Sequence, residues 1–257
     1  MARPISNTMM SMDKSLLLAA ALFALSASCA VQAQRGPDLA RVEALVIQGT
    51  NELRQEEHLP QVERNARLQD AVREFAAFMA RTGRFDHQAD GRNPSARARA
   101  HRYELCLIAE NISYLSSSAD FETTDLAKRL FEGWKNSPGH RKNMLQRDAT
   151  DTAVAVARST GGGAPRYYAV QMFGRPVSER VEFSVRNASD ALARYRLAGR
   201  EYEVYPGEVR THAECGPQAL AFDLPGDGGN RGSELNTRGG DTFVVRGSRG
   251  HLSIKRE

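Results

Sequence analysis

Residues 107–113 read Leu-Ile-Ala-Glu-Asn-Ile-Ser, so the carboxylate of Glu110 lies inside an otherwise apolar run. Burying an ionised carboxylate is costly unless it is paired or hydrogen-bonded, so we expect Glu110 to have polar partners. A second informative stretch, residues 137–143, reads Ser-Pro-Gly-His-Arg-Lys-Asn. Its Ser-Pro-Gly predicts the end of a helix, with His140 directly after the stop.

Two of the six histidines are candidates for a functional site. His87 follows a predicted helix end and His140 follows the Ser-Pro-Gly stop, so both are expected on loops held by rigid elements. A neutral imidazole can bind metal or move protons near neutral pH. The other histidines lie in polar or charged surroundings without a partner pattern, and we expect them at the surface: His58, His101, His212 and His251.

Two histidines and one glutamate match a catalytic zinc site with an open fourth position. No short ligand motif links His87, Glu110 and His140, so their spacing alone does not specify such a site. Ser137 precedes His140 closely enough to suggest a serine nucleophile. No nucleophile-elbow pattern surrounds Ser137, however, and a serine before proline more often caps or ends a helix.

Apolar periodicity predicts helices in the first two thirds of the chain. The clearest shows apolar residues at i, i+3 and i+4 over three turns, from Leu68 to near Gly83. The other helices are expected over 39–55 and over a segment that begins with capping residues 123–125 and stops at residues 137–139. Two apolar runs within 151–173 flank three consecutive glycines, which predicts a β-hairpin.

Beyond Pro176 the pattern changes to short alternating runs without an intervening helix. Such runs predict strands, and glycine-rich segments at 225–230 and 238–240 supply turns between them. We place a boundary near residue 178 and expect a small all-β module over 179–257. A module of this size has a marginal core of its own, so it is expected to dock on the first domain.

The order of short motifs resembles the CAP superfamily (cysteine-rich secretory, antigen 5 and pathogenesis-related proteins, also called the SCP domain) in a bacterial form. The resemblance covers residues 39–175. It rests on Asn51 with Arg54, Leu59-Pro60, Asn65, Leu68, Met79, His87, Glu110-Asn111-Ile112, Trp134, Ser137-Pro138-Gly139-His140-Arg141 with Asn143, and Tyr168 to Phe173 with Gly174.

The resemblance implies an α+β fold, a three-layer α-β-α sandwich with a solvent-filled cleft. In this family two histidines and two acidic residues line the cleft. The matching positions are His87, Glu110 and His140, whereas Ser137 stands where many members carry the second acid. We therefore expect a cleft formed by these four residues, in which the two histidines and Glu110 are metal-ligand candidates.

The N-terminus predicts export. Lys14 precedes an apolar run over 15–25 and then small residues up to Ala33, the order of a secretory signal peptide. We expect residues 1–33 to be removed and the mature chain, with no later transmembrane segment, to be secreted or periplasmic. The alternative is a lipid anchor on Cys29, although Leu25 lies four positions before it rather than the three typical of lipoprotein signals.

Cys106 and Cys215 remain after removal of the signal, in a compartment where disulfides persist. A bond between them would link the first domain to the β-rich tail. The alternative is two buried thiols.

The charge gives little support for a polyanionic partner. The formal net charge is +4, or +3 once Arg3, Asp13 and Lys14 leave with the signal, so we expect no nucleic-acid partner. One cluster contains four arginines and no acid, and it could face an anionic partner or be a solvated face: Arg92, Arg97, Arg99 and Arg102.

The sequence therefore favours a non-catalytic extracellular binding module for a lipid, a cell-envelope component or a protein, as the resemblance implies. Zinc or another divalent cation is the expected cofactor, if the protein has one. The alternative is a metal-dependent hydrolase or protease that uses the same cleft, with Glu110 as the base.

Overall fold

The computed structural model describes residues 1, 36–159, 161–223, 234–248 and 250–257. The predicted signal peptide over 1–33, with Cys29, lies outside the described residues except for Met1, as does the predicted turn at 225–230. No helix in the described part of the chain is long and apolar enough to cross a membrane.

The first sheet has four strands in the order β1-β3-β4-β2. Their bounds are β1 Glu63–Arg64, β2 Leu105–Ser116, β3 Asp151–Arg158 and β4 Arg166–Pro176. β2, β4 and β3 are antiparallel neighbours, and β1 pairs in parallel with the start of β3. The hairpin predicted within 151–173 is thus confirmed, whereas β2 was not identified as a strand from its sequence.

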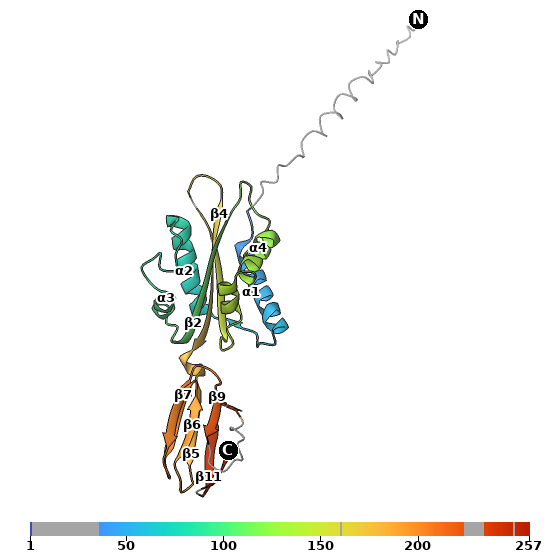
Figure 1. Ribbon diagram of the computed structural model, residues 1–257. Coiled ribbons are helices and arrows are strands. Elements are labelled where there is room, and N and C mark those ends of the chain that lie inside the picture. Colours follow the sequence, from blue (N-terminus) through green and yellow to red (C-terminus); the bar gives the residue numbers. More distant parts are fainter. Residues whose placement is uncertain (2–35, 160, 224–233, 249) are drawn as a thin grey trace. The chain divides into compact units, whose positions relative to one another are not determined.

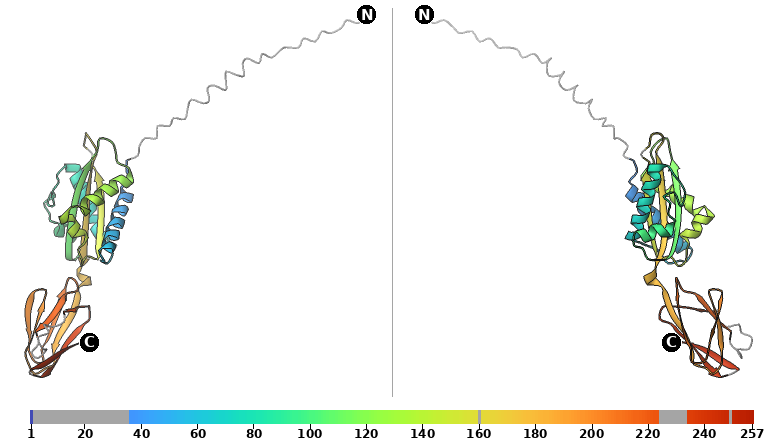
Figure 2. Two further views of the ribbon diagram at one scale, coloured as in Figure 1. Left: turned by 45° about the vertical axis from the view of Figure 1, so that its right-hand side comes forward. Right: turned by 90° about the vertical axis from the view of Figure 1, so that its left-hand side faces the viewer.

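Helices cover both faces of this sheet (Figure 1). The helices are α1 Leu39–Glu56, α2 Ala66–Thr82, α3 Pro94–Ala100, α4 Thr123–Lys135 and α5 Pro138–Met144. α2 and α3 lie on one side of the strands, and α1 and α4 lie on the other, as the turned views also show (Figure 2). The predicted three-layer α-β-α sandwich is confirmed.

The two helical layers explain the apolar sequence of the central strands. Successive side chains of a strand point to opposite faces, so a sheet covered on both faces has apolar residues at nearly every position. On β3, Ala153 and Ala155 pack in the cluster with α2, and Val154 and Val156 pack in the cluster with α1 and α4. Residues 151–156 are all buried.

The helix ends follow local side-chain chemistry. The Asn65 side chain accepts hydrogen bonds from the backbone amides of Arg67 and Leu68 and so caps the start of α2. Gly83 ends α2 in the left-handed conformation, with φ 71°, that glycine adopts without steric cost. The predicted end of this helix is confirmed, and its start lies two residues before Leu68.

Residues 137–139 start a helix rather than only ending one. α4 ends at Lys135, but Ser137 is the N-cap of a further helix, α5, whose first turn contains Pro138. Proline suits a first turn because its missing N–H has no helical partner there. The prediction that His140 lies on a loop is therefore wrong: His140 lies near the N-terminus of α5. The short helix α3, within the predicted loop after His87, was likewise not foreseen.

The C-terminal part is all-β, as predicted. It contains one sheet ordered β10-β9-β6-β7 and another ordered β12-β11-β5-β8, with a short 3₁₀ helix over Val177–Glu179 before them. The strands are β5 Val181–Asn187, β6 Ala193–Leu197, β7 Arg200–Val204, β8 Val209–Glu214, β9 Ala219–Asp223, β10 Leu235–Asn236, β11 Thr242–Ser248 and β12 His251–Arg256. A separate apolar cluster draws on both sheets. The domain boundary near residue 178 stays a prediction.

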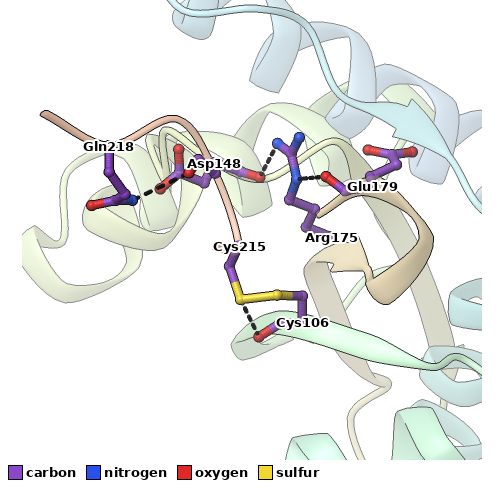
Figure 3. The surroundings of a disulfide bond; sticks show 7 residues. Cys106, Asp148, Arg175, Glu179, Cys215 and Gln218 are labelled. Atoms are coloured by element: carbon purple, nitrogen blue, oxygen red, sulfur yellow. Dashed lines mark hydrogen bonds between the residues drawn. A yellow bond between two sulfur atoms is a disulfide. The ribbon is translucent and has the colours of Figure 1, made fainter. Parts of the chain in front are cut away.

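Of the two alternatives for the cysteines, the structure has the disulfide: Cys106 and Cys215 are bonded, with their Cα atoms 5.5 Å apart (Figure 3). Cys106 lies near the start of β2, and Cys215 follows the end of β8. Both cysteines of the described chain are thus used in a bond between the first sheet and the β-rich tail.

His212 is not a surface residue, contrary to the prediction. It is 9% exposed, and its Nε2 lies 2.7 Å from the hydroxyl of Tyr195. Its ring stacks on Phe183 at 5.2 Å and meets Tyr202 edge-on at 4.9 Å. The prediction failed because β8 was not recognised as a strand, and the alternation of that strand turns His212 inward.

We expect His212 to make the protein less stable in mild acid. Burial lowers the pKa of His212 below its ordinary value of 6.5, while Glu214 raises it and Arg210 lowers it further. The unfolded chain therefore binds the proton first. Stability should fall as the pH drops through about 6.5 and level off below the folded-state pKa. Urea unfolding at about pH 8 and about pH 5 measures this, and the fall should be smaller in His212→Phe.

His251→Phe is the matched control, because His251 is exposed. If His212→Phe and His251→Phe lose the same stability between the two pH values, the acid sensitivity does not come from His212.

Candidate functional site

The structure brings the two predicted histidines to one cleft. His87 comes from the segment after α2, and His140 from the first turn of α5. A cavity of about 450 Å³ is lined by both, together with Phe85, Asp86, Ile112, Ser113 and Tyr114. Neither Glu110 nor Ser137, the other two predicted cleft residues, is among its lining residues. Ser137 is the N-cap position of α5.

Glu110 lies directly behind His87. Its side chain is only 1% exposed, and its Oε1 lies 2.8 Å from Nδ1 of His87. Nη2 of Arg97 donates to both carboxylate oxygens, at 2.9 and 2.8 Å. The sequence-based expectation that Glu110 needs partners agrees with these contacts, and the partners hold it as a buried carboxylate.

Arg97 also belongs to the site, although it was not predicted as a site residue from the sequence. Its side chain is 1% exposed, and besides Glu110 it donates to the Oδ1 of Asp90 at 2.8 Å and to the carbonyl of His87 at 2.7 Å. Its guanidinium lies 3.5 Å from the centroid of the Phe75 ring. Arg97 thus positions His87 in two ways. It donates to the backbone carbonyl of His87, and it holds the carboxylate of Glu110, which the His87 ring contacts.

The arginine cluster over 92–102 is therefore not a single solvated face. Arg92 pairs with Glu74 at 2.6 Å and with Asp90 at 2.9 Å, while Arg97 is internal. The acids that pair with these arginines lie outside the cluster in sequence. Arg97 occupies a buried position of α3. A prediction of this helix from the sequence would therefore have indicated that Arg97 is internal.

The pKa values of the two imidazoles shift in opposite directions. The hydrogen bond to Glu110 raises the pKa of His87 above 6.5, against an opposing effect of burial. Burial, with a smaller effect of His87, lowers the pKa of His140. A carboxylate accepts hydrogen bonds, so Nδ1 of His87 carries a proton. The Nδ1 of His140 is buried and has no partner among the described residues.

A metal centre with Glu110 as a ligand does not fit these contacts. Both oxygens of Glu110 already accept hydrogen bonds from Arg97, and one of them lies against His87. A catalytic zinc site uses three protein ligands. In the described ranges no group of three or more histidine, cysteine, aspartate or glutamate side chains is arranged to hold a metal ion. The cleft itself is lined by the rings of His87 and His140 and by Asp86.

Two exposed aromatic rings border the same cleft. Phe85 is 41% exposed and Tyr114 is 48% exposed. Their ring centroids are 4.9 Å apart in an edge-to-face arrangement, and Tyr114 stacks on the buried Tyr168 at 5.7 Å. Exposed rings in contact with each other form an apolar rim beside the histidines. Neither Phe85 nor Tyr114 was predicted from the sequence.

Amide side chains attach α5 to β2 and so position His140. Nδ2 of Asn143 donates to the carbonyl of Glu110 at 3.1 Å and to Oδ1 of Asn111 at 2.9 Å. Nδ2 of Asn111 donates to the carbonyl of His140 at 3.2 Å. These contacts explain why the segments 110–112 and 137–143 occur together: each carries polar groups that the other satisfies.

The buried Arg54 fixes the other end of α5. Within the described residues its guanidinium has no acidic partner, and it donates to backbone carbonyls of Pro60, Met144 and Gln146, at 2.8 to 2.9 Å. Burial lowers the pKa of Arg54. Met144 is the last residue of α5, so Arg54 links the end of α1 to the helix that carries His140.

Fold and site together define an α-β-α domain with a histidine-lined cleft. Residues 47–173 match the model of the cysteine-rich secretory protein family, CAP, and the chain belongs to this family. No curated protein matches the chain.

Three of the solved structures that the chain is similar to are of bacterial proteins. An outer surface protein from Borrelia burgdorferi is 19% identical with a TM-score of 0.44, over 55% of this chain and 98% of that protein. An extracellular protein containing an SCP domain from Bacillus anthracis is 23% identical with a TM-score of 0.44, over 52% of this chain and 40% of that one. A cysteine-rich secretory protein from Staphylococcus aureus is 19% identical with a TM-score of 0.40, over 53% and 39%. The match thus spans less than half of the latter two proteins.

Proposed function

We propose that this chain is an exported, non-catalytic binding protein whose CAP domain holds a lipid, a cell-envelope component or a protein in the cleft of His87 and His140. The predicted signal peptide supports a secreted or periplasmic location. Membership of the cysteine-rich secretory family agrees with that location. The exposed rings of Phe85 and Tyr114 beside the cleft support a binding role, because contiguous exposed apolar surface commonly marks an interaction site.

The state of Glu110 is the observation that carries this proposal. A general base needs a free lone pair within hydrogen-bond reach of the proton that it removes. The Glu110 carboxylate is 1% exposed and is occupied by Arg97 and His87, and it does not line the cavity. The residue that the hydrolase hypothesis assigns as base is therefore unsuited to activating water in this arrangement.

The second candidate, a metal-dependent hydrolase, is favoured by one contact. A histidine that ligates a metal usually donates its other ring N–H to a carboxylate, and Nδ1 of His87 contacts Glu110 at 2.8 Å. In this hypothesis Nε2 of His87 and the ring of His140 would hold zinc or another divalent cation. The metal would supply a polarised water, and Glu110 would orient His87 instead of acting as the base.

Metal content distinguishes the two functions. The purified mature protein, His87→Ala and His140→Ala are compared by elemental analysis and by calorimetric titration with zinc chloride. His251→Ala is the control, because His251 is exposed and lies in the β-rich tail. The binding proposal expects no stoichiometric metal and no zinc affinity that depends on both cleft histidines. One zinc per chain that both cleft variants lose and His251→Ala retains would contradict it and favour the hydrolase.

A further inference from the structure

Strand β2 lies at one edge of the first sheet. The strand order β1-β3-β4-β2 gives β2 a single neighbour, β4, with which it pairs from Leu105 to Ser116. A strand with one neighbour leaves half of its backbone N–H and C=O groups without a ladder partner. Long edge strands are normally covered by another element or blunted by charge.

The hydrogen-bond register identifies which residues point to the free edge. The carbonyl of Gly174 accepts from the amide of Thr150 on the β3 side, so the backbone N–H and C=O groups of the even-numbered residues of β4 point away from β2. The backbone groups of the odd-numbered residues of β4 therefore bond to β2. The register aligns Asn111 with Gln171. The backbone N–H and C=O groups of the odd-numbered residues of β2 therefore point to β4, and those of the even-numbered residues point to the free edge.

Side chains cover the first part of this edge. The outward carbonyl of Glu110 accepts from Nδ2 of Asn143 at 3.1 Å, and that of Ile112 accepts from Nε1 of Trp134 at 3.3 Å. Tyr114 is the next residue with the same orientation. Among the described residues, no hydrogen bond from another element reaches the outward N–H or C=O of Tyr114. The cover provided by α4 and α5 thus stops at Ile112.

The uncovered edge borders the cleft. Ile112, Ser113 and Tyr114 line the same cavity of about 450 Å³ as His87 and His140. The side chain of Tyr114 is 48% exposed and contacts Phe85. An open main-chain edge, an apolar rim and a cavity therefore meet at one place.

We propose that an extended peptide segment of a protein partner adds to the sheet as a strand along the edge of β2 at Tyr114 and Ser116. The proposal rests on the binding function above and names the class of ligand. Main-chain hydrogen bonds to Tyr114 and Ser116 give affinity. An apolar side chain of the peptide packs on Phe85 and Tyr114, and a side chain two positions away enters the cavity between the histidines.

A polypeptide fits this edge better than a lipid chain. Successive outward N–H and C=O pairs along a strand recur with the spacing of another strand, about 7 Å for two residues. An extended peptide satisfies both donor and acceptor at each repeat. An acyl chain satisfies neither, and would leave these backbone groups without partners.

The test selects heptapeptides from a random displayed library on the mature wild-type protein and synthesises the peptides that bind. Each is then made with a single N-methylated amide at every position in turn. Every second N-methylation should weaken binding about tenfold, because it removes a main-chain donor, and the intervening ones should have little effect. Tyr114→Ala should weaken binding at least as much, and Ser116→Pro should weaken it while Ser116→Ala does not.

Circular dichroism and thermal unfolding first establish that each variant is folded, as expected from the exposure of Tyr114 and Ser116. Failure to select any peptide, or affinities that do not alternate with N-methylation and do not change in Ser116→Pro, would overturn the edge site. In that case binding of the protein to lipid vesicles or to isolated cell envelope would still support the proposed function. Cleavage of a bound peptide would contradict the non-catalytic function and leave the edge site intact.

Discussion

Replacing Arg97 with methionine should lower the free energy of unfolding by about 3–5 kcal/mol, because it leaves buried carboxylates without a counter-ion. The side chains of Glu110 and Asp90 are 1% and 4% exposed, and both contact the Arg97 guanidinium at 2.8 Å. Methionine keeps most of the apolar stem but removes the guanidinium that lies over the Phe75 ring, so the loss of that contact adds to the cost. Urea unfolding of wild type and Arg97→Met measures the loss.

Two further variants separate this charge effect from a general cost of mutation. Arg92→Ala removes an arginine whose side chain is 35% exposed and should cost no more than about 1 kcal/mol. Adding Glu110→Gln to Arg97→Met removes one uncompensated charge and should recover part of the loss. Equal costs for Arg92→Ala and Arg97→Met would mean that the buried pair is not what stabilises the site.

The same variants bear on His87. Arg97 contacts the His87 carbonyl and also holds Glu110, which raises the pKa of His87. In Arg97→Met the carboxylate stays beside the ring but loses its fixed position. We therefore class Arg97 as a positioning residue, whose loss should be visible in the histidine resonances as well as in stability.

Elements with a regular apolar spacing could be predicted from the sequence, and elements whose apolar spacing is interrupted could not. The α2 repeat and the β3–β4 hairpin follow directly from apolar spacing, and both were predicted. β2 was not predicted because helices cover both faces of the sheet, so its apolar residues do not alternate with polar ones. Glu110 and Asn111 also interrupt its apolar run. The interruption was informative in another way, since it identified Glu110 as a residue with buried partners.

The missing partner was hidden by distance along the chain. Arg97 lies thirteen residues before Glu110, within a run of arginines that composition alone does not distinguish from a solvated face. Only the packing of α3 against α2 and β2 places this one arginine inside. The same limit applies to His140, because a Ser-Pro-Gly sequence both ends α4 and starts α5, and short helices have weak periodic signals.

Removing the disulfide should have an effect of similar size to the loss of Arg97. The cysteines are 109 residues apart in sequence, and cross-linking a loop of this length restricts the unfolded chain strongly. In the chain-entropy model a loop of about 100 residues gives about 4.7 kcal/mol, and measured losses for native disulfides are about 2–5 kcal/mol. Cys106→Ser with Cys215→Ser should therefore unfold at clearly lower urea than the oxidised wild type.

The surroundings of the bond indicate what else should change. Gly216, next to Cys215, approaches the side chain of Asp148 so closely that an added Cβ would collide with it. Nη1 of Arg175 donates to the carbonyl of Asp148 at 3.2 Å (Figure 3). The approach of Gly216 to Asp148 is thus a second contact beside the disulfide.

A comparison of unfolding curves distinguishes two roles of the bond. If it only restricts the unfolded chain, the double serine variant should show one transition at lower urea, with near-UV and far-UV signals that coincide. If it also couples the β-rich tail to the CAP domain, two transitions should appear, because each part has its own apolar cluster. A reducing agent should reproduce the result in wild type and change nothing in the variant. Equal midpoints for oxidised wild type and variant would show that the bond contributes no stability, and the tail would then depend on its own core and on contacts such as that of Gly216 with Asp148.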